Sequence, residues 1–183
     1  MTTKEKTLLR RASRYDEKAL AEVYDSYSPG IYRYAMRLLG DVDLAEECVA
    51  ETFSRFLMAL QRGLGPRDYL QAYLYRVAHN WITDHYRHQP QQTEPLESEV
   101  HAAGGQELID IVSQRQEQQR VRAALATLTP DQRQVVVLKF LEGWRNEEIA
   151  RSMGKPVGAI KSLQHRALDA LRRTLVFLEE NQS

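Results

Sequence analysis

Apolar residues recur three or four positions apart along nearly every patterned stretch of this chain, and this period is the strongest constraint on its fold. The stretch from about Tyr69 to His88 illustrates it, with an apolar stripe made of Leu70, Tyr73, Leu74, Val77, Ala78, Trp81 and Ile82. Alternation with a period of two, which is typical of half-buried strands, does not organise these stretches. We therefore predict an all-α protein.

The helical pattern falls into two blocks that suggest two small domains. The length of 183 residues allows one compact domain or two small ones. Residues 1–88 contain turn signals at Pro29-Gly30, Gly40-Asp41 and 63–68, which predict three or four helices. Residues 89–113 contain prolines, paired glycines, glutamines and glutamates, and we interpret them as a flexible linker. Residues 114–183 then form the second domain.

Several classes of protein are disfavoured by simple sequence features. The longest apolar runs, such as Val135 to Leu138, fall far short of the roughly 20 residues that a membrane-spanning helix needs. The N-terminus lacks the apolar run of a signal peptide. The single cysteine, Cys48, cannot form an internal disulfide, which fits a reducing compartment, and we expect it to be a buried helical residue. We therefore expect a cytoplasmic protein without membrane insertion.

Charge is strongly separated along the chain although the formal net charge is zero. Residues 41–60 hold five acids and one base, a net charge of −4. Residues 151–173 hold six bases and one acid, a net charge of +5. One surface is therefore suited to a basic protein and another to phosphate groups.

The most specific local pattern is a helix-turn-helix in the second block. A short helix near Asn146 to Met153 is interrupted at Gly154, and a longer helix follows from about Pro156. On a helical wheel the packing side of the second helix holds Ile160, Leu163, Ala167, Leu168 and Leu171. The other side holds Lys161, Ser162, His165, Arg166, Asp169, Arg172 and Arg173. An ordinary amphipathic helix is the alternative, but the glycine turn and the positive charge favour binding in the major groove of DNA.

A second polar surface lies opposite the apolar stripe of residues 69–88. It consists of Arg76, Asn80, Thr83, Asp84 and Arg87. Such side chains can bond base edges and phosphates, and the nearby Tyr69, Tyr73, Tyr75, Trp81 and Tyr86 offer rings for stacking unpaired bases, although most of these rings are expected in the core. Position alone leaves a solvated face and a single-strand-binding face as equal alternatives.

A third surface is acidic. Asp43, Glu46, Glu47 and Glu51 share one side of a predicted helix, whose other side is apolar. Acids near the start of a helix complement its dipole and often do no more than that. The functional alternative is a docking face for a basic protein surface.

Three stretches, taken in order, resemble the sigma-70 family of bacterial transcription initiation factors, specifically its small two-domain extracytoplasmic-function (ECF) type. They are YSPGIYRYAMRLLGDVDLAEECVAETFSRFL, YLYRVAHNWITDHYRH and, after LTPDQRQVVVLKFLEGWRNEEIA, the helix VGAIKSLQHRALDALRR. The resemblance implies a region 2 domain that binds the clamp helices of core RNA polymerase and reads the melted minus-ten element. It also implies a region 4 helix-turn-helix that reads the minus-thirty-five element as duplex. An anti-sigma factor is a further partner that the resemblance suggests.

The resemblance assigns roles to the three surfaces. The clamp helices would be faced by Asp43, Glu46, Glu47 and Glu51. The minus-ten strand would lie beside Asn80, Asp84 and Arg87, which share their face with Arg76 and Thr83. The groove at minus thirty-five would receive Lys161, Ser162, His165 and Arg166. The loop 62–68 would hold a flipped-out base, and the linker would thread the polymerase cleft. Family arginines are frequent at the positions of Leu163 and His79, and we expect Leu163 to pack instead.

Two rival functions are weaker. An enzyme could use the histidines and aspartate of HNWITDHYRH, but only Asp84 and His88 lie one turn apart, whereas a metal site needs three or four converging ligands. We therefore expect no catalytic residues, no metal and no cofactor. A helix-turn-helix regulator with a ligand-sensing first domain would explain the second block equally well. It would not require the acidic surface or the polar surface of residues 76–87.

Overall fold

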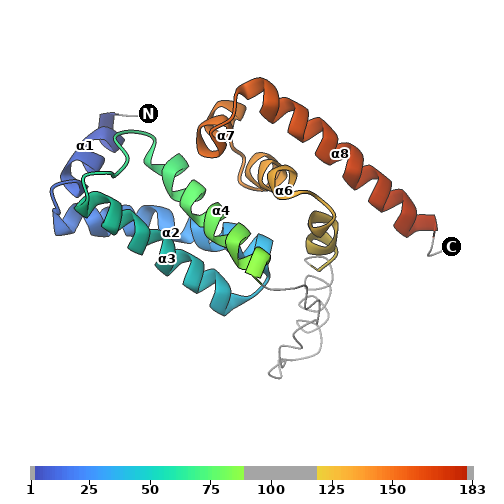
Figure 1. Cartoon of the computed structure of the whole chain (residues 1–183), viewed down its shortest axis with the longest axis horizontal. Coiled ribbons are helices and arrows are strands. Elements are labelled where there is room, and N and C mark those ends of the chain that lie inside the picture. The colour runs from blue at the N-terminus through green and yellow to red at the C-terminus, as the bar shows by residue number, and fades with distance from the viewer. Residues whose placement is uncertain (1–2, 89–118, 181–183) are drawn as a thin grey trace, which may run out of the picture.

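The structure is a computed structural model that describes residues 3–88 and 119–180. Every regular element in those two ranges is helical, which confirms the all-α prediction. Figure 1 shows the helices of the first block on one side and those of the second block on the other. The predicted linker, residues 89–113, lies outside the described ranges.

The first block contains α1 (Thr3–Ala12), α2 (Glu17–Leu39), α3 (Val42–Gln61) and α4 (Leu70–His88). Aspartates begin two of them, because Asp16 Oδ1 accepts the N–H of Ala19 at 3.1 Å and Asp41 Oδ1 accepts that of Leu44 at 2.9 Å. Gly40 ends α2 in the left-handed conformation, with φ of 74°. The turn predicted at Gly40-Asp41 is therefore confirmed.

The turn predicted at Pro29-Gly30 is wrong, because α2 runs straight through both residues. An internal proline loses one helical hydrogen bond and costs about 3 kcal/mol. Val23 and Ile31 on either side of it are fully buried, and this packing holds the helix together. Gly30 allows α4 to approach closely, since a Cβ at this position would lie 2.7 Å from the Tyr75 hydroxyl.

The second block comprises a helical stretch at 119–126, then α6 (Pro130–Val136), η1 (Val137–Leu141), α7 (Asn146–Met153) and α8 (Val157–Glu180). Thr129 and Gln132 form a capping box at the start of α6, and Pro130 follows Thr129 at the start of the helix. The segment η1 is a π-helix, which the sequence analysis did not anticipate.

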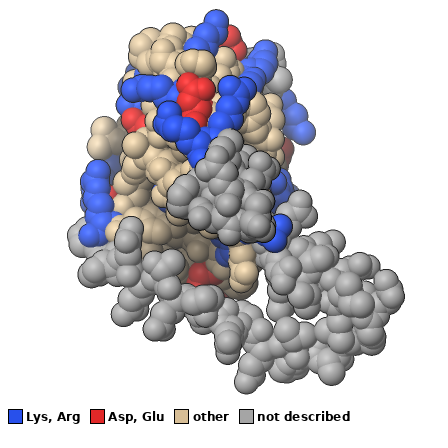
Figure 2. Space-filling view, turned by 90° about the vertical axis from the view of Figure 1, so that its right-hand side faces the viewer, with Lys and Arg blue, Asp and Glu red and all other residues tan. Residues whose placement is uncertain are grey.

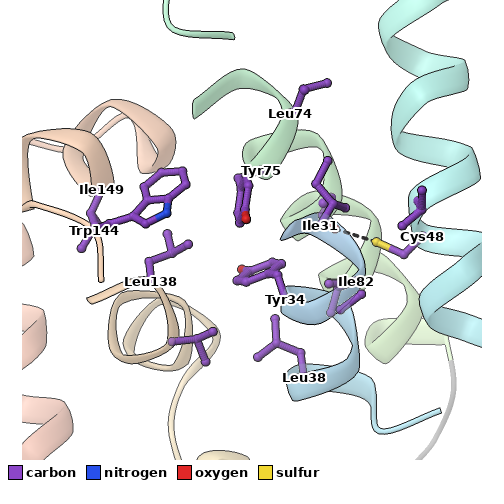
Figure 3. Packing of buried hydrophobic residues seen from close by; sticks show 14 of the residues in the cluster. Ile31, Tyr34, Leu38, Cys48, Leu74, Tyr75, Ile82, Leu138, Trp144 and Ile149 are labelled. Carbon is purple, nitrogen blue, oxygen red and sulfur yellow. Dashed lines mark hydrogen bonds between the residues drawn. The ribbon is translucent and has the colours of Figure 1, made fainter. Parts of the chain in front are cut away.

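The buried apolar residues of both blocks form one continuous cluster. Figure 3 shows its centre, where Tyr34 and Tyr75 of the first block meet Leu138, Trp144 and Ile149 of the second. The rings of Tyr34 and Tyr75 have centroids 5.3 Å apart, and those of Tyr75 and Trp144 are 4.7 Å apart. The two blocks therefore pack against each other through aromatic contacts, which are favourable at these separations.

Candidate nucleic-acid interface

The helix-turn-helix predicted from the sequence is present as α7, a turn and α8. Gly154 adopts φ of 64° at the end of α7, and its N–H bonds back to the carbonyl of Ala150. Ile160, Leu163 and Ala167 hold α8 against the block and are all buried, so the prediction that Leu163 packs is confirmed. Leu168 was expected on the same side but is 36% exposed, because it lies at the edge of the apolar stripe.

The polar side of α8 is open to solvent. Lys161, Ser162, His165 and Arg166 are all exposed. The Ser162 hydroxyl donates to the carbonyl of Gly158 at 3.1 Å, and His165 Nε2 lies 3.4 Å from Asp169 Oδ2. These contacts run along α8 itself, so the four side chains present an accessible surface. Figure 2 shows Lys and Arg side chains gathered over the part of the molecule where α8 lies.

The polar face of α4 lines a cleft between the two blocks. Asn80, Thr83, Asp84 and Arg87 lie on one wall together with His79, and the opposite wall is formed by Thr129, Pro130 and Asp131. The cleft has a volume of about 580 Å³. The structure thus brings together four of the five residues expected on this face. Arg76 points elsewhere, and its guanidinium donates to the backbone carbonyls of Arg151 and Ser152 in α7.

His79 also lines this cleft, although the sequence placed it only among the histidines of the enzyme alternative and among the departures from the family. Its Nδ1 lies 2.9 Å from the hydroxyl of Tyr34, which is fully buried, and its Nε2 lies 3.3 Å from Thr83 Oγ1. Burial lowers the pKa of His79 from 6.5 to about 4, so the ring is neutral at physiological pH. A neutral ring can accept from one hydroxyl and donate to the other. Its contact with Thr83 could have been inferred from the sequence, because the two residues are four positions apart and so lie one turn apart on a helix.

This depressed pKa predicts that the protein loses stability in mild acid. Below pH 6.5 the unfolded chain protonates His79 while the folded chain does not, so stability is full above pH 6.5 and falls towards pH 4. The loss should approach about 3 kcal/mol, at 1.36 kcal/mol for each unit of pKa difference. Urea unfolding across this pH range should show a steeper fall for the wild type than for His79→Gln. Parallel curves for the two proteins would contradict the assignment.

The aromatic residues proposed for base stacking are mostly occupied. Tyr75 is buried, Tyr73 packs near Phe56 with centroids 6.2 Å apart, and Trp81 stacks on His85 at 5.3 Å. Exposed rings remain at Tyr69 and Tyr86, and each has an arginine of the second block over it: Arg151 lies 4.3 Å from the Tyr69 centroid, and Arg133 lies 5.5 Å from that of Tyr86.

The loop 62–68, between α3 and α4, is exposed at its tip. Leu64 is 75% accessible, and Gly63 adopts φ of 68° beside it. Tyr69, at φ of 49°, leads into α4, where Glu5 of α1 accepts the N–H of Leu70 at 3.1 Å. The carboxylate of Glu5 thereby satisfies one of the free N–H groups at the start of α4.

The acidic side of α3 faces solvent, as predicted. Asp43, Glu46 and Glu47 are exposed, while Glu51 Oε1 accepts from Arg55 Nε at 2.7 Å. The opposite side of α3 is buried, and Cys48 within it is fully inaccessible. Burial raises the pKa of the Cys48 thiol to about 12, which keeps it protonated and confirms its expected role as a core residue.

Among the residues that the structure describes, no three His, Cys, Asp or Glu side chains converge in a way that could hold a metal ion. The side chain of His88, named above with Asp84, lies outside what is described. Within the same ranges, no helix is both long and apolar enough to cross a membrane.

Two family models match the chain in the order expected. Sigma-70 region 2 matches residues 23–91, and Sigma-70, region 4 matches residues 118–171. The first match contains α3, α4 and most of α2. The second contains α6, α7 and α8 as far as Leu171, and thus the exposed Lys161 and Arg166.

Known proteins are similar to this chain in sequence and in fold. The ECF RNA polymerase sigma factor BldN of Streptomyces coelicolor is 34% identical over 174 residues, which are 92% of this chain and 64% of that protein. The chain therefore spans about two thirds of the length of that relative. CnrH, solved with the cytosolic domain of CnrY, is similar in fold, with a TM-score of 0.70 at 23% identity and coverage of 93% of this chain and 96% of that one.

A further solved structure is the sigma factor RpoE in complex with the anti-sigma factor NepR from Bartonella quintana. It has a TM-score of 0.54 at 26% identity, and the match covers 81% of this chain and 91% of that one. With both regions matched in order and a curated relative named as an ECF sigma factor, the chain belongs to the sigma-70 family, as a member of its ECF type.

Proposed function

We propose that this chain binds core RNA polymerase in the cytoplasm and directs promoter recognition, DNA melting and transcription initiation. It does so without catalytic activity of its own and without a cofactor. The observation that carries the proposal is the helix-turn-helix of α7 and α8, whose groove-facing side chains are exposed, in a chain that also matches region 2. Residues 1–88 act as the region 2 domain, 89–113 as the linker and 114–183 as the region 4 domain.

Recognition at minus thirty-five falls to α8. Lys161 and Arg166 supply charge for phosphates and guanine edges, and Ser162 and His165 add shorter polar groups one turn apart. The buried Ile160, Leu163 and Ala167 fix the orientation of the helix, so that this side faces outwards. A duplex can therefore approach α8 without any rearrangement of the second block.

Recognition at minus ten falls to α4 and the loop before it. Asn80, Thr83, Asp84 and Arg87 offer amide, hydroxyl, carboxylate and guanidinium groups to an unpaired strand. Arg76 shares their side of the helix by period, but its guanidinium donates to carbonyls of α7. The exposed loop 62–68 would receive a base extruded from the strand. Extrusion costs a few kcal/mol, which stacking and hydrogen bonds must offset.

Core polymerase binds the acidic side of α3. Asp43, Glu46 and Glu47 are solvent-exposed, Glu51 adjoins them, and few bases lie among them, so their field can steer a basic surface towards α3. An anti-sigma factor is a further partner of this chain, by analogy with the solved complex of RpoE and NepR.

Run-off transcription tests the proposal. Purified core polymerase is assayed with and without this protein on a pool of genomic promoter fragments. We expect initiation at a defined subset of fragments only when the protein is present. Tight duplex binding by the protein alone, with no new starts when core polymerase is added, would instead favour a regulator with a ligand-sensing first block.

A further inference from the structure

A second basic surface lies on α1 and the turn that follows it. Residues 4–14 hold five bases and one acid, a net charge of +4. Arg11 is paired with Asp16, and its Nε lies 2.9 Å from Oδ2 of that residue. The other four bases are exposed and, within the described ranges, take no part in an ion pair: Lys4, Lys6, Arg10 and Arg14. We call these four residues the α1 surface.

The core of the first block keeps the α1 surface turned outwards. Leu8, Leu9 and Ala12 form the apolar side of α1 and are all buried. Lys6 and Arg10 are four positions apart, so they lie one turn from each other on the opposite side of the helix. Because α1 is packed along its apolar side, these two bases face solvent without any rearrangement.

This surface lies beside the loop that is proposed to receive an extruded base. Glu5 Oε1 accepts the N–H of Leu70 at 3.1 Å, which ties α1 to the first residue of α4. The loop 62–68 precedes α4 and passes next to α1 (Figure 1). It holds one acid and two exposed bases, Arg62 and Arg67. Basic side chains therefore continue from the loop onto α1.

The charge of the α1 surface selects its partner. A basic protein surface, which complements the acids of α3, would be repelled by α1, whereas nucleic-acid phosphates would be attracted to it. The region 2 match begins at residue 23 and does not include α1. In the proposed function the duplex at minus thirty-five is read by α8, and the melted strand is the nucleic acid that reaches the loop beside α1.

We infer that the α1 surface binds the backbone of the melted strand next to the extruded base, on the side of that base away from α4. This inference rests on the proposed function, which brings the strand to the loop 62–68. The ligand is the phosphate of single-stranded DNA, and Lys6 and Arg10 make the two central contacts. Phosphate contacts carry no sequence information. They lengthen the stretch of strand that is held open without narrowing the choice of promoter.

Strand length tests the inference in the complex with core polymerase. The full chain and core polymerase are titrated against labelled single-stranded oligonucleotides from a promoter recovered by run-off transcription. A fluorescent base analogue locates the extruded base, because its emission changes when it leaves the stack. A short oligonucleotide spans the minus-ten element up to this base, and two longer ones are extended at one end or the other. We expect an extension to strengthen binding whatever its base sequence is.

A double variant identifies the extension that reaches α1. Lys6→Gln and Arg10→Gln are combined, since glutamine removes the charge and is a comparable helix former. This variant should bind the short oligonucleotide as the wild type does and lose the gain from one extension only. Losing two phosphate contacts should lower the salt slope for that extension by about 1.4, which is about sevenfold in affinity over a fourfold range of salt. The matched control, Arg33→Gln with Arg120→Gln, removes two exposed bases outside the proposed surfaces and should keep both gains.

Methylphosphonate linkages give a second readout that needs no substitution in the protein. They remove the charge of single phosphates in the strand. Placed in the extension that reaches α1, they should abolish its gain with the wild type and change nothing with the double variant. The inference therefore stays testable even where the double variant fails to fold, which circular dichroism reports.

Three results would overturn the inference: a folded double variant that keeps both gains, a loss that is equal for short and long oligonucleotides, or a wild-type gain that survives methylphosphonate linkages. Run-off transcription separates this failure from that of the proposed function. Any of the three results with a wild type that directs initiation leaves the sigma role intact. A wild type that neither directs initiation nor binds the strand with core polymerase counts against the sigma role itself.

Discussion

Reversing the acidic side of α3 should weaken binding to core RNA polymerase by about 100-fold. Glu46→Lys, Glu47→Lys and Glu51→Lys replace a complementary field with a repulsive one, and roughly 1 kcal/mol for each reversed charge gives a loss of this size. Asp43 is left unchanged so that this variant and its control each reverse three charges. Affinity for core polymerase is measured by fluorescence anisotropy of the labelled protein at several salt concentrations.

The control is a triple variant with the same change in net charge at exposed acids elsewhere, namely Glu17→Lys, Asp25→Lys and Glu147→Lys. It should bind core polymerase nearly as the wild type does. Circular dichroism should show unchanged helix content in both triple variants, since the reversed side chains lie outside the core. Equal affinities of the two triple variants would show that α3 is not the docking face.

Removing the basic side chains of α8 should weaken binding to the minus-thirty-five duplex. Lys161→Ala and Arg166→Ala should each cost about 1 to 3 kcal/mol if the side chain reads a base, which corresponds to a loss of roughly 5- to 150-fold. A side chain that contacts only phosphate should instead weaken all sequences evenly and lower the salt dependence by about one unit of slope. Competition between promoter and random duplexes across salt concentrations distinguishes the two roles.

Lys18→Ala is the matched control because Lys18 is exposed on α2, in the first block. It should leave duplex affinity within the error of the measurement. Unchanged affinity in both α8 variants would remove α8 from the interface. A loss confined to Arg166→Ala would assign base reading to that residue alone.

Features set by neighbouring residues were predictable from the sequence. The capping box at Thr129, the left-handed Gly154 and the burial of Leu163 all follow from short-range patterns and are present in the structure. The same local reasoning failed at Pro29, because burial on both sides of the proline outweighs its intrinsic tendency to end a helix. Local signals are reliable where tertiary packing does not oppose them.

The cleft beside α4 could not be predicted because its walls come from residues about 50 positions apart in the sequence. The helical period placed Asn80, Thr83, Asp84 and Arg87 on one side, but not the second block that faces them. Arg76 belongs to the same side by period, yet it bonds to carbonyls more than 70 residues away. Backbone carbonyls are present at every residue, so sequence cannot mark the ones that will lack a partner.

The packing of Trp144 against Tyr75 gives the protein an intrinsic optical probe of its own conformation. The chain has two tryptophans, and Trp144 is 7% exposed at the boundary between the blocks, whereas Trp81 stacks on His85 within α4. Indole emission shifts to longer wavelength in water, so separation of the blocks would redden the fluorescence of Trp144 and leave that of Trp81 nearly constant. Assembly on polymerase and promoter can thus be timed by stopped flow through the emission of Trp144, once Trp81 and the tryptophans of polymerase are accounted for.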